Sequence, residues 1–97
     1  MLTDSQRRYL RGVAQTLKPV VILGQKGITP ALVAEISHCL HDHELIKLKI
    51  NAADRIQRDE LVATVCQQAQ AELVHRIGNM AALYRKNPKQ EKIVLPA

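Results

Sequence analysis

The tetrapeptide Gly24-Gln25-Lys26-Gly27 has the residue types and spacing best suited to binding chemistry in this chain. Glycines adopt backbone conformations that other residues avoid, and they let a ligand come close to the main chain. The tetrapeptide follows the apolar run 20–23 and precedes Thr29-Pro30, a pair typical of a helix start. Backbone amides at such a junction can bind phosphate. The sequence therefore predicts a phosphate-binding loop that contains Gly24, Gln25, Lys26, Gly27 and Thr29.

This tetrapeptide also has two other interpretations. A Gly-x-x-Gly sequence can be a simple turn, since glycine is common in turns. The phosphate loop of nucleotide hydrolases needs wider glycine spacing followed by Lys and Ser or Thr, and that pattern is absent here. The sequence shows no Ser-His-Asp, Cys-His or paired-carboxylate arrangement that rises above chance. We therefore expect no catalysis, no cofactor and no small-molecule substrate.

Histidines and cysteines gather in one segment, at His38, Cys39, His41 and His43. Their spacing matches no familiar zinc pattern, and a helical projection turns His38 and His41 away from the apolar face. We expect surface histidines and no metal. Cys39 and Cys66 lie on or beside apolar helix faces, and disulfides are rare in the cytosol. The prediction for both is a reduced, partly buried thiol.

Length and charge restrict the class of protein. The 97 residues suit one domain, which we expect to span 1–97 with a C-terminal arm at 86–97. Lys and Arg total 14 against 9 Asp and Glu, a net charge of +5 that favours acidic partners. No apolar run approaches the ~20 residues needed to cross a bilayer, and the N-terminus lacks the pattern of a signal peptide. We expect a cytoplasmic protein without a membrane partner.

Hydrophobic periodicity and turn residues divide the chain into seven elements. The predicted helices are about 4–17, 30–41 and 59–70, and the predicted strands are 20–23, 45–50, 72–77 and 80–85. The apolar strand 20–23 is expected to be covered on both sides or central in its sheet. Gly78-Asn79 suits a hairpin turn. Residues 87–97 are predicted to form a loop or extended arm without firm structure.

This order of elements predicts parallel strands joined by helical crossovers, followed by an antiparallel hairpin. The expected fold is a two-layer α/β domain, α-β-α-β-α-β-β, with a four-stranded mixed sheet. Strand 45–50 alternates in period two. Ile46, Leu48 and Ile50 should face the core, while Lys47 and Lys49 should project from a face open to solvent.

The first helix supplies a second basic element. Arg7, Arg11 and Lys18 fall within ~40° of one another on a helical projection, and Arg8 lies at the edge of this group. An ordinary solvated helix face is the alternative. Tyr9, one of two aromatic residues in the chain, shares the apolar stripe and is expected in the core, which argues against base stacking on aromatics. The predicted RNA-binding cations outside the glycine loop are Arg7, Arg8, Arg11, Lys18, Lys47 and Lys49.

Several segments together resemble the CRM domain family (chloroplast RNA splicing and ribosome maturation), especially its bacterial single-domain, YhbY-like members. The resemblance covers nearly the whole chain. It rests on residues 10–12, 17–19, 21–29, 45–49, 76–78 and 83–85, which read LRG, LKP, VILGQKGIT, LIKLK, RIG and LYR. The hairpin departs from the family pattern, because Ala81-Ala82 stands where larger β-branched residues are expected.

This resemblance implies a fold similar to the C-terminal domain of initiation factor three, with a loop similar to the GxxG loop of KH domains. It also implies an assembly factor that binds ribosomal RNA in precursors of the large ribosomal subunit. Separately, we expect the protein to be a monomer. An adaptor that binds protein on the ribosome is the alternative, since the run Ile93-Val94-Leu95 offers an apolar anchor.

Overall fold

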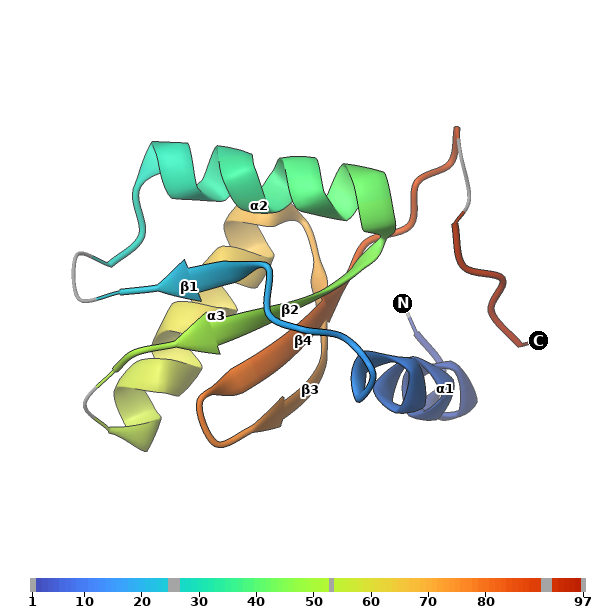
Figure 1. The fold of residues 1–97 in the computed structure, drawn as a ribbon, viewed down its shortest axis with the longest axis horizontal. Coiled ribbons are helices and arrows are strands. Elements are labelled where there is room, and N and C mark those ends of the chain that lie inside the picture. The colour runs from blue at the N-terminus through green and yellow to red at the C-terminus, as the bar shows by residue number, and fades with distance from the viewer. Residues whose placement is uncertain (1, 25–26, 53, 90–91, 97) are drawn as a thin grey trace.

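Four strands form one mixed sheet, and three helices pack against it (Figure 1). The computed structural model describes residues 2–24, 27–52, 54–89 and 92–96. The elements are α1 (Asp4–Ala14), β1 (Val21–Leu23), α2 (Pro30–His43), β2 (Leu45–Ile50), α3 (Arg55–Ala69), β3 (Glu72–Ile77) and β4 (Met80–Tyr84). The predicted order of elements and the mixed sheet are confirmed. Strand order is β1-β2-β4-β3, with β1 parallel to β2 and β4 antiparallel to both of its neighbours.

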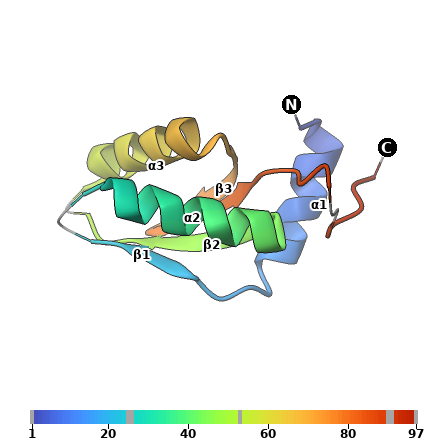
Figure 2. The same cartoon turned by 90° about the horizontal axis from the view of Figure 1, so that it is seen from above.

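Two helices cover one face of the sheet, and the third covers part of the other face (Figure 2). The main core lies between the sheet and α2 and α3, and it contains Ile46, Leu48 and Ile50 from β2. A second cluster joins α1 to the opposite face, through contacts of Leu10 and Ala14 with residues of β2, β3 and β4. Lys47 and Lys49 are half-exposed, as the alternation predicts. The face expected to be open is therefore covered at one end by α1.

The position of β1 differs from the prediction. This strand lies at the edge of the sheet, and Ile22 is 58% exposed. Its apolar sequence suggested a central strand, but β4 takes the place on the other side of β2. The hydrophobic periodicity of a strand does not show which later strand will pair with its neighbour.

Two helix boundaries also differ from the prediction. The first helix ends at Ala14 because its last turn changes to hydrogen bonds between residues three apart, such as Thr16 N to Val13 O at 3.1 Å. The third helix begins four residues earlier than predicted, because Asp54 Oδ1 caps it by accepting a hydrogen bond from Gln57 N at 2.8 Å.

The alanines of the hairpin are explained by the central position of β4. Ala81 packs in the main core and Ala82 in the α1-side cluster, with exposures of 1% and 4%. Both faces of this strand are covered, so small residues let the helices approach closely. Gly78, in the turn before β4, has φ +57°, a conformation that suits glycine.

The C-terminal arm is more ordered than the sequence suggests. The buried carboxylate of Glu44 accepts hydrogen bonds from the backbone N–H groups of Asn87 and Ile93, both at 2.7 Å, and of Lys92 at 2.5 Å. Ile93 and Leu95 pack against the α1-side cluster. The described residues of the arm form no helix or strand, as predicted, but these contacts hold them against the domain.

Candidate nucleic-acid interface

The glycine loop opens on a cavity at one end of the molecule, where the C-terminal ends of β1 and β2 meet the start of α3 and the hairpin turn. Two backbone hydrogen bonds join these segments, from Asn51 N to Leu23 O at 2.8 Å and from Ile50 N to Asn79 O at 2.7 Å. The cavity has a volume of about 670 Å³. Its described lining residues are Gly24, Gly27, Ile50, Asn51, Ala52, Gln57, Arg58, Leu61, Gly78 and Asn79.

Gly24 and Gly27 each have free space where a side chain would begin. A Cβ atom built on either glycine would have no heavy atom within 4 Å among the described residues. Gly27 has φ +75°, a left-handed conformation that favours glycine. Gly24 does not have this left-handed conformation. Gly24 O accepts a hydrogen bond from Gly27 N at 3.2 Å, as expected of a turn, and the free space at Gly24 leaves room for a ligand to approach. Gln25 and Lys26 lie outside the described residues.

Thr29 caps α2, as predicted. Its Oγ1 accepts a hydrogen bond from Leu32 N at 3.1 Å, and Pro30 follows as the first residue of the helix. A hydroxyl that accepts one hydrogen bond still has its own proton to donate. The N-terminal end of a helix also carries a partial positive charge. Thr29 can therefore cap α2 and donate a hydrogen bond to an anion at the same time.

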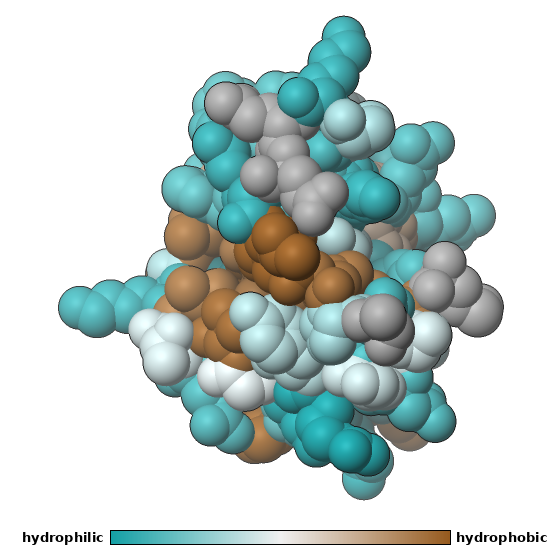
Figure 3. Space-filling view, turned by 90° about the vertical axis from the view of Figure 1, so that its right-hand side faces the viewer, coloured by the Kyte–Doolittle hydropathy of each residue, from teal (hydrophilic) through white to brown (hydrophobic). Residues whose placement is uncertain are grey.

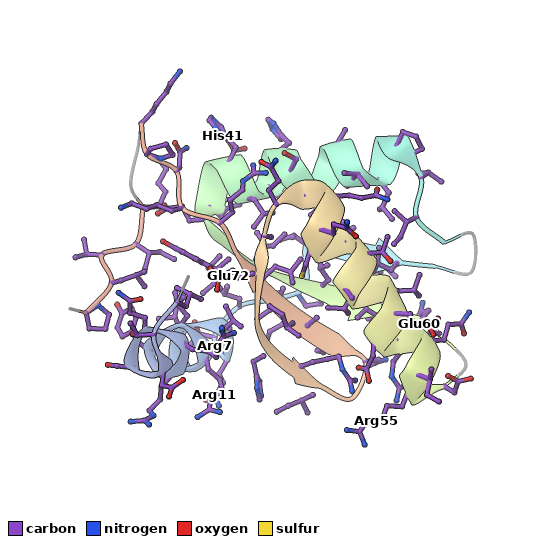
Figure 4. All side chains as sticks on the ribbon, turned by 180° about the vertical axis from the view of Figure 1, so that it is seen from behind. Arg7, Arg11, His41, Arg55, Glu60 and Glu72 are labelled. Atoms are coloured by element: carbon purple, nitrogen blue, oxygen red, sulfur yellow. The ribbon has the colours of Figure 1, made fainter. Side chains whose placement is uncertain are left out.

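Two arginines of α3 belong to this end of the molecule, although the sequence-based list omits them. Arg58 lines the cavity, and Arg55 projects from the first residue of the helix (Figure 4). Arg58 Nε is buried and has no hydrogen-bond partner among the described residues. The predicted helix 59–70 begins after both arginines, because the acidic Asp59 and Glu60 suit a first turn. The sequence signal for this earlier helix start is Asp54, a residue type that caps helices, followed by Gln57 three residues later.

The predicted cations form a stripe that leads away from the glycine loop. Lys47 lines one groove with Arg11 and a second groove with Lys18. Lys49 lies two residues further along β2, toward the glycine-loop end, on the same face as Lys47. The α1 helix itself lies at the opposite end of the molecule, whose longest dimension is 38 Å (Figure 1). The cations therefore do not gather in one patch with the loop.

Two other predicted cations are placed differently. The Arg7 guanidinium lies 3.6 Å from the Glu72 carboxylate and donates a hydrogen bond to Leu73 O (Figure 4). This contact partly neutralises its charge and ties α1 to β3. Arg8 is exposed on α1. We expect Arg7 to attract an anion less strongly than Arg8 or Arg11.

The sequence model of the CRS1/YhbY (CRM) domain matches residues 2–85. The chain belongs to the CRS1/YhbY (CRM) domain family. A probable RNA-binding protein of Pseudomonas aeruginosa is 43% identical over 94% of this chain and 88% of its own length. An RNA-binding protein of Haemophilus influenzae is 39% identical over 98% and 95%. The solution structure of a hypothetical protein from Staphylococcus aureus covers 99% of this chain and 100% of its own, with 34% identity and a TM-score of 0.85.

Tyr9 of this CRM domain is 45% exposed, so its expected place in the core is wrong. The buried stripe of α1 is centred on Leu10 and Ala14, which leaves Tyr9 at its edge. Tyr84 is buried.

No helix of the described residues has the length and apolar character needed to cross a membrane. The described residues also contain no group of three His, Cys, Asp or Glu that could hold a metal ion; His38 instead lies 3.2 Å from Asp42.

Both cysteines of the CRM domain are free thiols and half-buried, which confirms the prediction. Burial raises the pKa of Cys66 from 9.0 to about 11. The raised pKa favours the protonated thiol in the folded state, so this contribution to stability is complete below about pH 9 and is lost as pH rises through about 11. We expect the free energy of unfolding, measured by urea titration, to fall less steeply above pH 9 in Cys66→Ala than in the wild type. Equal slopes would contradict this assignment.

Proposed function

We propose that this CRM domain binds ribosomal RNA in precursors of the large ribosomal subunit and acts there as a non-catalytic assembly factor. It works as a monomer in the cytoplasm. Family membership and the two relatives named as RNA-binding proteins support the RNA part of this proposal. The net charge of +5 supports a polyanionic partner.

The observation that carries the proposal is the free space over Gly24 and Gly27 beside a cavity whose described lining contains no carboxylate. In our proposal an RNA phosphate lies on this backbone, with Lys26 and the start of α2 supplying positive charge. The strand then follows Lys49 and Lys47 toward Arg11 and Lys18. Phosphate contacts of this kind supply affinity and position, with little reading of sequence.

Salt titration tests the phosphate contacts. We expect the affinity for a fragment of large-subunit RNA to fall linearly with salt on a double logarithmic plot, because neutralised phosphates release counterions. The double variant Lys47→Ala and Lys49→Ala should reduce the slope by about one to two units. Lys86→Ala with Lys89→Ala is the matched control, since both lysines are exposed on the arm. An identical slope in both double variants would remove β2 from the interface.

The ribosomal part needs a test in cells. RNA fragments crosslinked to the protein are expected to map to large-subunit RNA. A scatter of unrelated messages would defeat the ribosomal assignment.

A protein-binding adaptor is the second candidate function, and the end of the molecule opposite the glycine loop favours it. Apolar side chains gather in the middle of that face (Figure 3). Val94 of the arm is 78% exposed, and a largely apolar groove between α1, β2 and the arm includes Val13, Leu17 and Ile93. Association with ribosomal particles that survives digestion of the RNA, without binding to purified RNA, would favour the adaptor.

A further inference from the structure

The cavity beside the glycine loop is larger and more apolar than a phosphate site requires. A phosphate requires only donors at the loop surface, whereas this cavity of about 670 Å³ is within the size range of sites that enclose an organic ligand. Part of its lining is apolar, contributed by Ile50, Ala52 and Leu61. The rest includes the side-chain amides of Asn51 and Asn79 and the guanidinium of Arg58.

This combination of groups matches the chemistry of a nucleobase. A base has apolar ring faces and an edge that carries both donors and acceptors, and an asparagine amide can bond to both kinds of group. Asn51 and Asn79 hold their places through backbone hydrogen bonds to Leu23 and Ile50, and both residues are exposed. Arg58 Nε has no partner among the described residues, so this side chain can turn toward a ligand without losing a hydrogen bond there.

The walls of the cavity are held in place by contacts outside it. Arg76 Nε lies 2.6 Å from Asp59 Oδ1, and Arg76 Nη1 donates a hydrogen bond to Gly78 O at 2.7 Å. These contacts tie the hairpin turn to the first turns of α3. The two asparagines and Arg58 therefore lie on segments fixed relative to one another, as a binding site requires.

We propose that this cavity binds an unpaired nucleobase of the RNA strand whose phosphate lies on the glycine loop. The inference rests on the proposed function. A paired base is stacked and has its edge occupied, so it cannot enter a concave site, whereas a base in a loop or bulge can turn outward. The preferred RNA is therefore single-stranded at the point of contact.

Three polymers of ~12 nucleotides, a length typical of small single-strand-binding domains, test this inference by fluorescence anisotropy. They are oligoadenylate, oligouridylate and an abasic ribose-phosphate chain of equal length. The wild type is expected to bind at least one base-bearing polymer about tenfold more tightly than the abasic chain. The double variant Asn51→Ala and Asn79→Ala should lose this preference and keep its affinity for the abasic chain. Gln67→Ala with Gln68→Ala, on the exposed C-terminal part of α3, should behave as the wild type.

The remaining outcomes overturn the inference. Equal affinity of the wild type for all three polymers would overturn it and leave phosphate binding in place. A preference that survives in the asparagine variant would place the base elsewhere. If no polymer binds while a large-subunit RNA fragment does, single-stranded recognition is wrong and the proposed function stands. If the fragment also fails to bind, both proposals fall.

Discussion

Replacement of Glu44 by alanine is expected to lower the free energy of unfolding by about 3 kcal/mol. The Glu44 side chain is fully buried, and its two oxygens accept backbone hydrogen bonds from three residues of the C-terminal arm. Alanine would leave these N–H groups without their acceptor and open a space between α2 and the arm. For a domain of this size the melting temperature should fall by roughly 10 °C or more.

Thermal and urea unfolding measure this effect, with Glu35→Ala as the matched control. Glu35 lies on α2, the helix that Glu44 follows, and is exposed, so its replacement should change stability by less than about 0.5 kcal/mol. Glu44→Gln should fall between the two, because its amide retains one acceptor oxygen and turns a donor group toward the N–H donors. Equal stability of Glu44→Ala and Glu35→Ala would show that the arm does not depend on this carboxylate.

Replacement of Gly24 by valine is expected to weaken RNA binding about tenfold or more and to leave the fold intact. The valine Cβ would enter free space, so this atom requires no described side chain to move. The same atoms would stand where we propose that the RNA backbone approaches. A ligand held at a greater distance loses hydrogen bonds to the loop, and a loss of 1.4 kcal/mol is a factor of ten in affinity.

Binding to a large-subunit RNA fragment and circular dichroism should be measured on the same samples. Gly12→Ala is the control, because a Cβ there also meets no heavy atom but lies on α1, at the other end of the molecule. That variant should bind RNA normally and be more stable by up to ~1 kcal/mol, since alanine favours a helix. Normal binding by a folded Gly24→Val protein would exclude the loop from the interface.

Local signals were sufficient where an element depends on its own residues. The alternation in β2, the Thr29 cap and the Gly78-Asn79 turn each predicted the observed structure. The predictions failed where the structure of a segment depends on residues far away in the sequence. The edge position of β1 depends on β4, and the order of the arm depends on Glu44, which lies 43 residues before Asn87.

The candidate site shows the same division. Spacing alone identifies the glycine loop and the lysines of β2 as candidates, and their role in binding stays a prediction. Sequence reasoning missed the asparagines at the cavity, which come together only when β2 and the hairpin pair. Nor could it foresee that Arg85, part of the family resemblance, is a structural residue that donates hydrogen bonds to Ala69 O and Ser37 O, both at 2.8 Å.

The central place of β4 has a consequence for biosynthesis. This strand is the last of the four to be synthesised, yet it joins β2 to β3 in the middle of the sheet. A nascent chain that ends before Met80 has two separate parts of a sheet and a core without Ala81 and Leu83. Folding of the whole sheet therefore begins only after translation has passed residue 84, and stalled shorter chains should be sensitive to protease.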